Sequence, residues 1–72
     1  MKHFLEASGY IHEVGNISFK KEVSDNNKDE VLLEFFESGT WGHIDDIDII
    51  EVGEDGKRKV IESFKKGKWV SV

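Results

Sequence analysis

The chain contains no cysteine and has no long apolar stretch. Without thiols, neither a disulfide framework nor a thiolate metal site can supplement the core, and nothing points to an oxidising compartment. The N-terminal MKHFLEASGY lacks the apolar run of a signal peptide, and no segment approaches the ~20 apolar residues of a membrane helix. We therefore expect a cytoplasmic protein that neither enters nor crosses a membrane.

Motifs for catalysis and for cofactor binding are also missing. No Ser, His and acid trio occupies a recognisable elbow, and the GEDGK stretch at 53–57 lacks the spacing of a nucleotide-binding loop. His43 with the neighbouring aspartates invites a metal site, but the order DDIDII lacks the alternating ligands and central glycine of a calcium loop. We expect no enzymatic activity, no cofactor and no bound metal.

What is present is enough for one small domain spanning residues 1–72. The 72 residues are 38% hydrophobic and include two Trp, five Phe and one Tyr, too many large apolar groups for a disordered chain. The core is thin at this length, so a homodimer that covers further apolar surface is an additional expectation.

Charge is distributed unevenly along the chain. Residues 22–55 contain twelve acids against the single base Lys28, a balance of −11, while residues 56–72 contain six bases against Glu62, a balance of +5. Such asymmetry bears on the choice of partner and on association rates rather than on the fold.

The N-terminal third predicts a β-hairpin. Lys2–Glu6 and Tyr10–Val14 are strand candidates separated by Ala7-Ser8-Gly9, and Gly15-Asn16 separates two alternating runs as a two-residue turn would. That turn would place Val14 opposite Ile17 and His12 opposite Phe19. The predicted core face of the hairpin is then Tyr10, His12, Val14, Ile17, Phe19 and Val23.

Residues 28–38 are predicted to form a helix. Asn27 is a suitable N-cap, Glu30 follows three residues later, and Gly39 stands where a helix usually stops. The rival interpretation takes VLLEFF as a strand, since alternate residues there are apolar as well. The helix would bury Val31, Leu32, Phe35 and Phe36, and would expose a row of carboxylates at Glu30, Glu34 and Glu37.

A turn at Gly39–Gly42 is predicted to lead into a central strand, Trp41–Val52, in which β-branched residues interleave with acids. Ile49 and Ile50 cannot both face inward in a regular pleat, so either a bulge lies near them or a dimer interface covers the second face. Turns at 53–56 and at Lys66-Gly67 would complete a three-stranded meander, with Phe64 opposite Trp69.

The predicted fold class is therefore α+β, with a small antiparallel sheet and one short helix. An N-terminal hairpin and the C-terminal meander supply its strands. A small all-β barrel is the alternative, and it follows if residues 28–38 form a strand.

The acids can hold rows of negative charge at separations comparable with those of a phosphate backbone, on a helix or on a strand. In its size, missing cysteines and clustered acids, the chain resembles the small DNA-mimic inhibitors encoded by bacteriophages. The resemblance implies a protein-binding module that occupies the DNA-binding surface of a basic host protein, such as a nucleoid protein, during host takeover. The candidate partner-binding residues are Glu30, Glu34, Glu37, Asp45, Asp46, Asp48, Glu51, Glu54 and Asp55.

Two other interpretations remain open. The basic C-terminus could bind nucleic acid directly, because aromatic residues accompany its bases in a β-meander: Phe64 and Trp69 with Lys57, Arg58, Lys59, Lys65, Lys66 and Lys68. Alternatively, pairing across the 53–56 turn brings three of these bases near Glu51 and Asp48 as surface ion pairs. The acids would then form a solvated face or serve an unrelated protein interaction.

Overall fold

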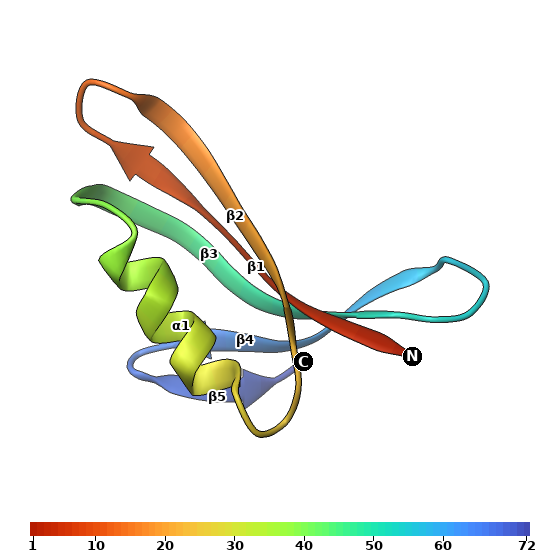
Figure 1. Ribbon diagram of the computed structural model, residues 1–72. Coiled ribbons are helices and arrows are strands. Elements are labelled where there is room, and N and C mark those ends of the chain that lie inside the picture. Colours follow the sequence, from red (N-terminus) through yellow and green to blue (C-terminus); the bar gives the residue numbers. More distant parts are fainter.

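A computed structural model describes residues 1–72 and contains five strands and one helix (Figure 1). In chain order these are β1 (Lys2–Ile11), β2 (Gly15–Val23), α1 (Lys28–Glu37), β3 (Trp41–Val52), β4 (Arg58–Lys65) and β5 (Lys68–Ser71). The strands form one antiparallel sheet in the order β2-β1-β3-β4-β5. The fold is thus a small, sheet-dominated one with a single short helix. Because the sheet is open, with β2 and β5 at its edges, the barrel alternative is wrong.

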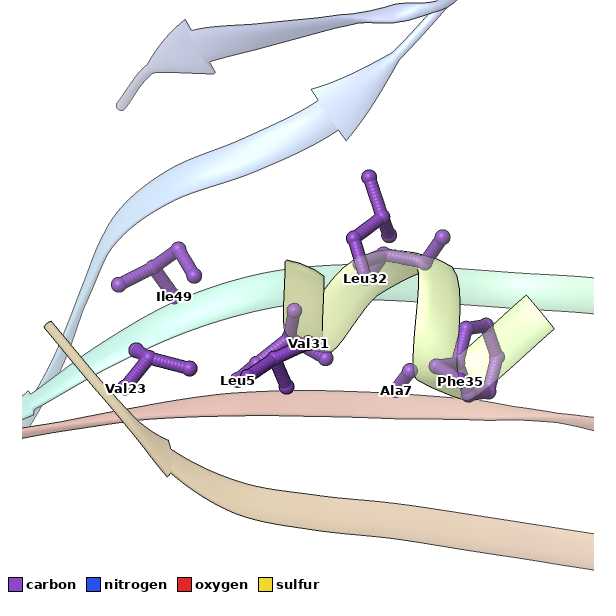
Figure 2. Packing of buried hydrophobic residues seen from close by; sticks show 8 residues of the cluster. Leu5, Ala7, Val23, Val31, Leu32, Phe35 and Ile49 are labelled. Carbon is purple, nitrogen blue, oxygen red and sulfur yellow. The ribbon is translucent and has the colours of Figure 1, made fainter. Parts of the chain in front are cut away.

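The core lies between α1 and one face of the sheet (Figure 2). Leu5 of β1 and Phe35 of α1 are fully buried at its centre. The backbone of α1 lies nearest to β1 and β2, and its first turn reaches the β4–β5 hairpin, where Lys28 donates to Glu62 at 2.8 Å and the Trp69 indole N–H donates to Asp29 at 2.9 Å. That hairpin contributes three partly buried side chains to the core, namely Ile61, Phe64 and Trp69. The twist of the sheet therefore lets a single helix contact both halves of it.

Residues 28–37 form the expected helix, and the rival strand is wrong. Val31, Leu32 and Phe35 are buried as predicted, but Phe36 remains 38% exposed at the border with β4. Asn27 stands at the N-cap without capping the helix, because its side-chain oxygen accepts a hydrogen bond from the Ser24 backbone N–H at 2.8 Å instead. No helix of the structure is long and apolar enough to cross a membrane.

The N-terminal hairpin differs from the prediction in its turn and its register. Residues 2–11 form one unbroken strand, and the turn comprises residues 12–14, with Ile11 opposite Gly15. Glu13 adopts the left-handed φ of 72° that this earlier turn requires. Ile17 therefore faces Gly9, and Phe19 faces Ala7.

This register changes the core face of the hairpin. The predicted pairs of Val14 with Ile17 and His12 with Phe19 are wrong, and both Val14 and His12 are exposed. The observed register places Leu5 and Ala7 under Phe35, on the same face as Phe19. Burial of these side chains against the helix outweighs the local preference of Gly15-Asn16 for a turn.

Strand β3 has the predicted bounds and is interrupted by bulges. Its pairing with β1 shifts between Ser8 and Gly9 and again between Tyr10 and Ile11, which leaves Asp45 and Gly42 as extra residues. The turn before β3 is shorter than predicted, since Trp41 and Gly42 already belong to the strand.

A third bulge lies beside Ile49 and Ile50, but its extra residue is in β4, and these two isoleucines alternate: Ile49 is in the core cluster under α1 and Ile50 is buried outside it. Their pairing with β4 shifts between Glu62 and Val60, so Ile61 of β4 is the extra residue. Ile49 and Ile50 are 3% and 6% exposed within one chain. The predicted bulge is confirmed, and these two residues need no dimer interface to cover them.

The C-terminal hairpins follow local turn chemistry as predicted. The β3–β4 loop is closed by the Gly53 N–H donating to the Lys57 carbonyl oxygen at 3.0 Å. Lys66 and Gly67 both have positive φ, 52° and 80°, as a tight two-residue hairpin turn requires. Phe64 lies opposite Trp69, with ring centroids 5.1 Å apart in an edge arrangement, which confirms the predicted pair.

Candidate functional site

The sheet separates the nine candidate acids instead of gathering them. In β3, Ile47 and Ile49 are buried on the side of α1, so the alternating Asp46 and Asp48 lie on the opposite face of the sheet. The three glutamates of α1 are exposed on the side of the helix that faces away from the sheet. No single flat partner can cover both groups at once. We call the first group the sheet-face pair (Asp46 and Asp48) and the second the helix row (Glu30, Glu34 and Glu37).

The helix row surrounds an exposed leucine. Leu33 is 57% exposed and, with Ser38 and the three glutamates, lines a shallow hollow. Residues 30, 33, 34 and 37 have the i, i+3, i+4, i+7 spacing of one helix face, and the glutamates rise by about 6 Å and then about 4.5 Å along the axis. Leu33 is not among the site residues predicted from the sequence, although the same spacing could have identified it.

The charges of the helix row are only partly compensated. Lys21 of β2 donates to both carboxylate oxygens of Glu34, at 2.9 Å and 2.7 Å, and so orients that side chain. Glu30 and Glu37 make no ion pair in the structure. The helix row therefore presents two free carboxylates on either side of a fixed one.

The sheet-face pair has a more mixed environment. Asp48 accepts a hydrogen bond from the Ser63 hydroxyl at 2.6 Å, and the two aspartates line a hollow that also contains Glu6 and Lys20. Arg58 forms an ion pair with Glu6 across this face. Cations already accompany the acids here, so this face is a weaker attractor for a basic partner than the helix row.

The other four candidate acids are dispersed. Asp45 lies at a β3 bulge, 3.1 Å from His43 Nε2, and Glu51 lies 3.2 Å from His3 Nε2. Glu54 and Asp55 belong to the β3–β4 loop, where Asp55 accepts a hydrogen bond from the Lys57 N–H at 3.0 Å. Three of these four carboxylates thus have local partners, and none of the four adjoins the helix row.

The C-terminal bases do not form one patch. Lys57, Arg58 and Lys59 stand at the start of β4, whereas Lys65, Lys66 and Lys68 surround the turn at its far end. The two groups are about 23 Å apart along the strand. Lys59 lies opposite Glu51 as predicted, but Arg58 pairs with Glu6 and not with Glu51 or Asp48.

The structure contains no group of three or more His, Cys, Asp or Glu side chains arranged to hold a metal ion. Comparisons with protein-family models, with curated proteins and with solved structures found no match to this chain. The candidate sites of this protein are therefore its helix row, its sheet-face pair and its two groups of bases.

Proposed function

We propose that this protein is an acidic binding module that occupies the DNA-binding surface of a basic protein, with the helix row as its main contact. One observation supports the proposal above the others. An ordered helix presents Glu30, Glu34 and Glu37 around the exposed Leu33, and Lys21 is the only cation in ionic contact with the three carboxylates.

Electrostatics favour such a partner. The −11 balance of residues 22–55 attracts a cationic surface at long range and is screened over a Debye length of about 8 Å at physiological ionic strength. DNA-binding surfaces carry lysine and arginine spaced to meet phosphates, and carboxylates along a helix can meet the same side chains. Leu33 adds an apolar contact at the centre of the charged patch, where water is most fully excluded.

The biological role follows from the resemblance to phage-encoded DNA-mimic inhibitors. We propose a non-enzymatic inhibitor that acts in the cytoplasm on a basic host protein such as a nucleoid protein. Direct binding to nucleic acid is the alternative, and the division of the bases between the two ends of β4 disfavours it.

A competition assay tests the proposal. Labelled DNA is bound to a basic nucleoid protein of the HU type, and this protein is then added at moderate salt. We expect DNA release, and we expect Glu30→Gln with Glu37→Gln to reduce the potency about tenfold, because two uncompensated carboxylates are lost without a change in packing.

The matched control is Glu54→Gln with Asp55→Asn, which removes the same charge from the β3–β4 loop and should leave potency nearly unchanged. Equal losses in the two double variants would show that only net charge matters and would contradict the assignment to the helix row. Retardation of DNA by this protein alone would favour direct nucleic-acid binding instead.

A further inference from the structure

We propose that two copies of this chain pair antiparallel through the outer edges of their β2 strands and so form a ten-stranded sheet. The β2 edge adjoins the helix row through the Lys21–Glu34 ion pair, but pairing through it does not depend on the proposed function. The inference rests on the length and regularity of the β2 edge, on the positions of its lysines, and on its self-complementary sequence.

The outer edge of β2 is long and unbroken. All nine residues of β2 pair with β1 without a bulge, and β2 is the first strand of the sheet order. None of the backbone hydrogen bonds outside the helix and the sheet ladders involves a β2 residue. A row of backbone N–H and C=O groups is therefore free to pair with another strand. The opposite edge, β5, has only four residues and begins with Lys68.

Lysines often protect such edges, but those of β2 are held within their own chain. The Lys20 ammonium lies 4.7 Å from the centre of the Phe4 ring, and the Lys21 ammonium is bound by Glu34. The two lysine side chains therefore lie over opposite faces of the sheet, and they leave the backbone groups at the outer edge of β2 accessible.

One register makes the edge complementary to itself. With the two-fold axis at Lys21, Lys20 faces Glu22 of the second copy, and this pair occurs twice on the open face of the sheet. Phe19 faces Val23 of the second copy, again twice, on the core side where Phe19 is only partly buried. Lys21 meets its own copy at the axis, with each charge already paired to Glu34.

The β2 edge is a different interface from the one that the sequence predicts, which lies on the central meander. The sequence predicts self-association through Ile49 or Ile50, with Trp41 as a further candidate, if these side chains remain uncovered in the central meander. The two isoleucines are buried within one chain, and Trp41 packs against the core and donates its indole N–H to the Phe35 carbonyl at 3.1 Å. These three residues therefore supply no reason for a dimer.

Sedimentation over a micromolar to millimolar concentration series tests the proposal. The wild type should change from the mass of one chain to that of two as concentration rises. Lys20→Glu and Glu22→Lys should each raise the dissociation constant about tenfold, because two attractive pairs become two repulsive ones. The double variant Lys20→Glu/Glu22→Lys exchanges the charges and should restore the wild-type constant.

Glu54→Lys is the control, since it makes the same charge change as Glu22→Lys in a loop outside the proposed interface. Circular dichroism verifies that each variant is folded, and the two single variants test the register independently of each other. A wild type that stays monomeric throughout the series overturns the proposal. So does a dimer that is indifferent to both single variants, or a double variant that fails to restore pairing.

Discussion

Gly9 occupies a position in β1 that has no room for a side chain. A Cβ there would lie 2.6 Å from the His43 carbonyl oxygen and 2.8 Å from the Trp41 ring. We expect Gly9→Ala to lower the free energy of unfolding by about 3 kcal/mol, because backbone and a packed indole must both move. The matched control is Gly42→Ala, whose Cβ would lie 3.2 Å from the Tyr10 ring edge and should cost below about 1 kcal/mol. Urea denaturation measures both, and equal losses would contradict this account.

At the scale of elements, two adjacent phenylalanines of α1 differ in what they support. Phe35 is fully buried, with its ring against those of Phe19, Trp41 and Phe36. Phe36 is 38% exposed and lies at the border of the core, where its ring also meets Phe64. Phe35→Ala should cost about 3–5 kcal/mol, which is comparable with the whole stability of so small a domain, and should leave the chain largely unfolded.

Phe36→Ala makes the same change in helix propensity and should cost about 1–2 kcal/mol, because less of its ring is removed from water. Thermal denaturation followed by circular dichroism compares the two variants. A Phe36 variant as unstable as the Phe35 variant would mean that the border with β4 is part of the central core.

At the scale of the whole molecule, the sheet should be most stable at its centre. Residues 48–52 of β3 are paired with both β1 and β4, and Ile47 and Ile49 lie in the core under α1, while β5 is a four-residue edge strand paired on one side only. We expect the amides of Ile47 and Ile49 to exchange with solvent at least about a hundredfold more slowly than those of β5, since β5 can detach without opening the core. Hydrogen exchange followed by NMR measures this difference, and uniform protection would show that the sheet opens only as a unit.

The sequence by itself determined the features that depend on neighbours along the chain. These are the helix at 28–37, the bounds of the strand at 41–52, the turn at Lys66-Gly67 and the Phe64–Trp69 pair. In each of them the periodicity and the turn residues agree, so local preference and final structure coincide. The carboxylate row at Glu30, Glu34 and Glu37 follows from helical spacing alone.

Only the tertiary structure decided the hairpin register, the strand order and the division of the acids between two faces. Gly15-Asn16 favours a turn, but burial of Leu5 and Ala7 under Phe35 moves the turn to residues 12–14. The bulge leaves Asp45 without a partner in β1 and interrupts the alternation of side chains there. Asp46 and Asp48 lie on the face of the sheet opposite the helix row. The physical reason is that burial acts between residues far apart in the chain, and it outweighs turn preferences that act between neighbours.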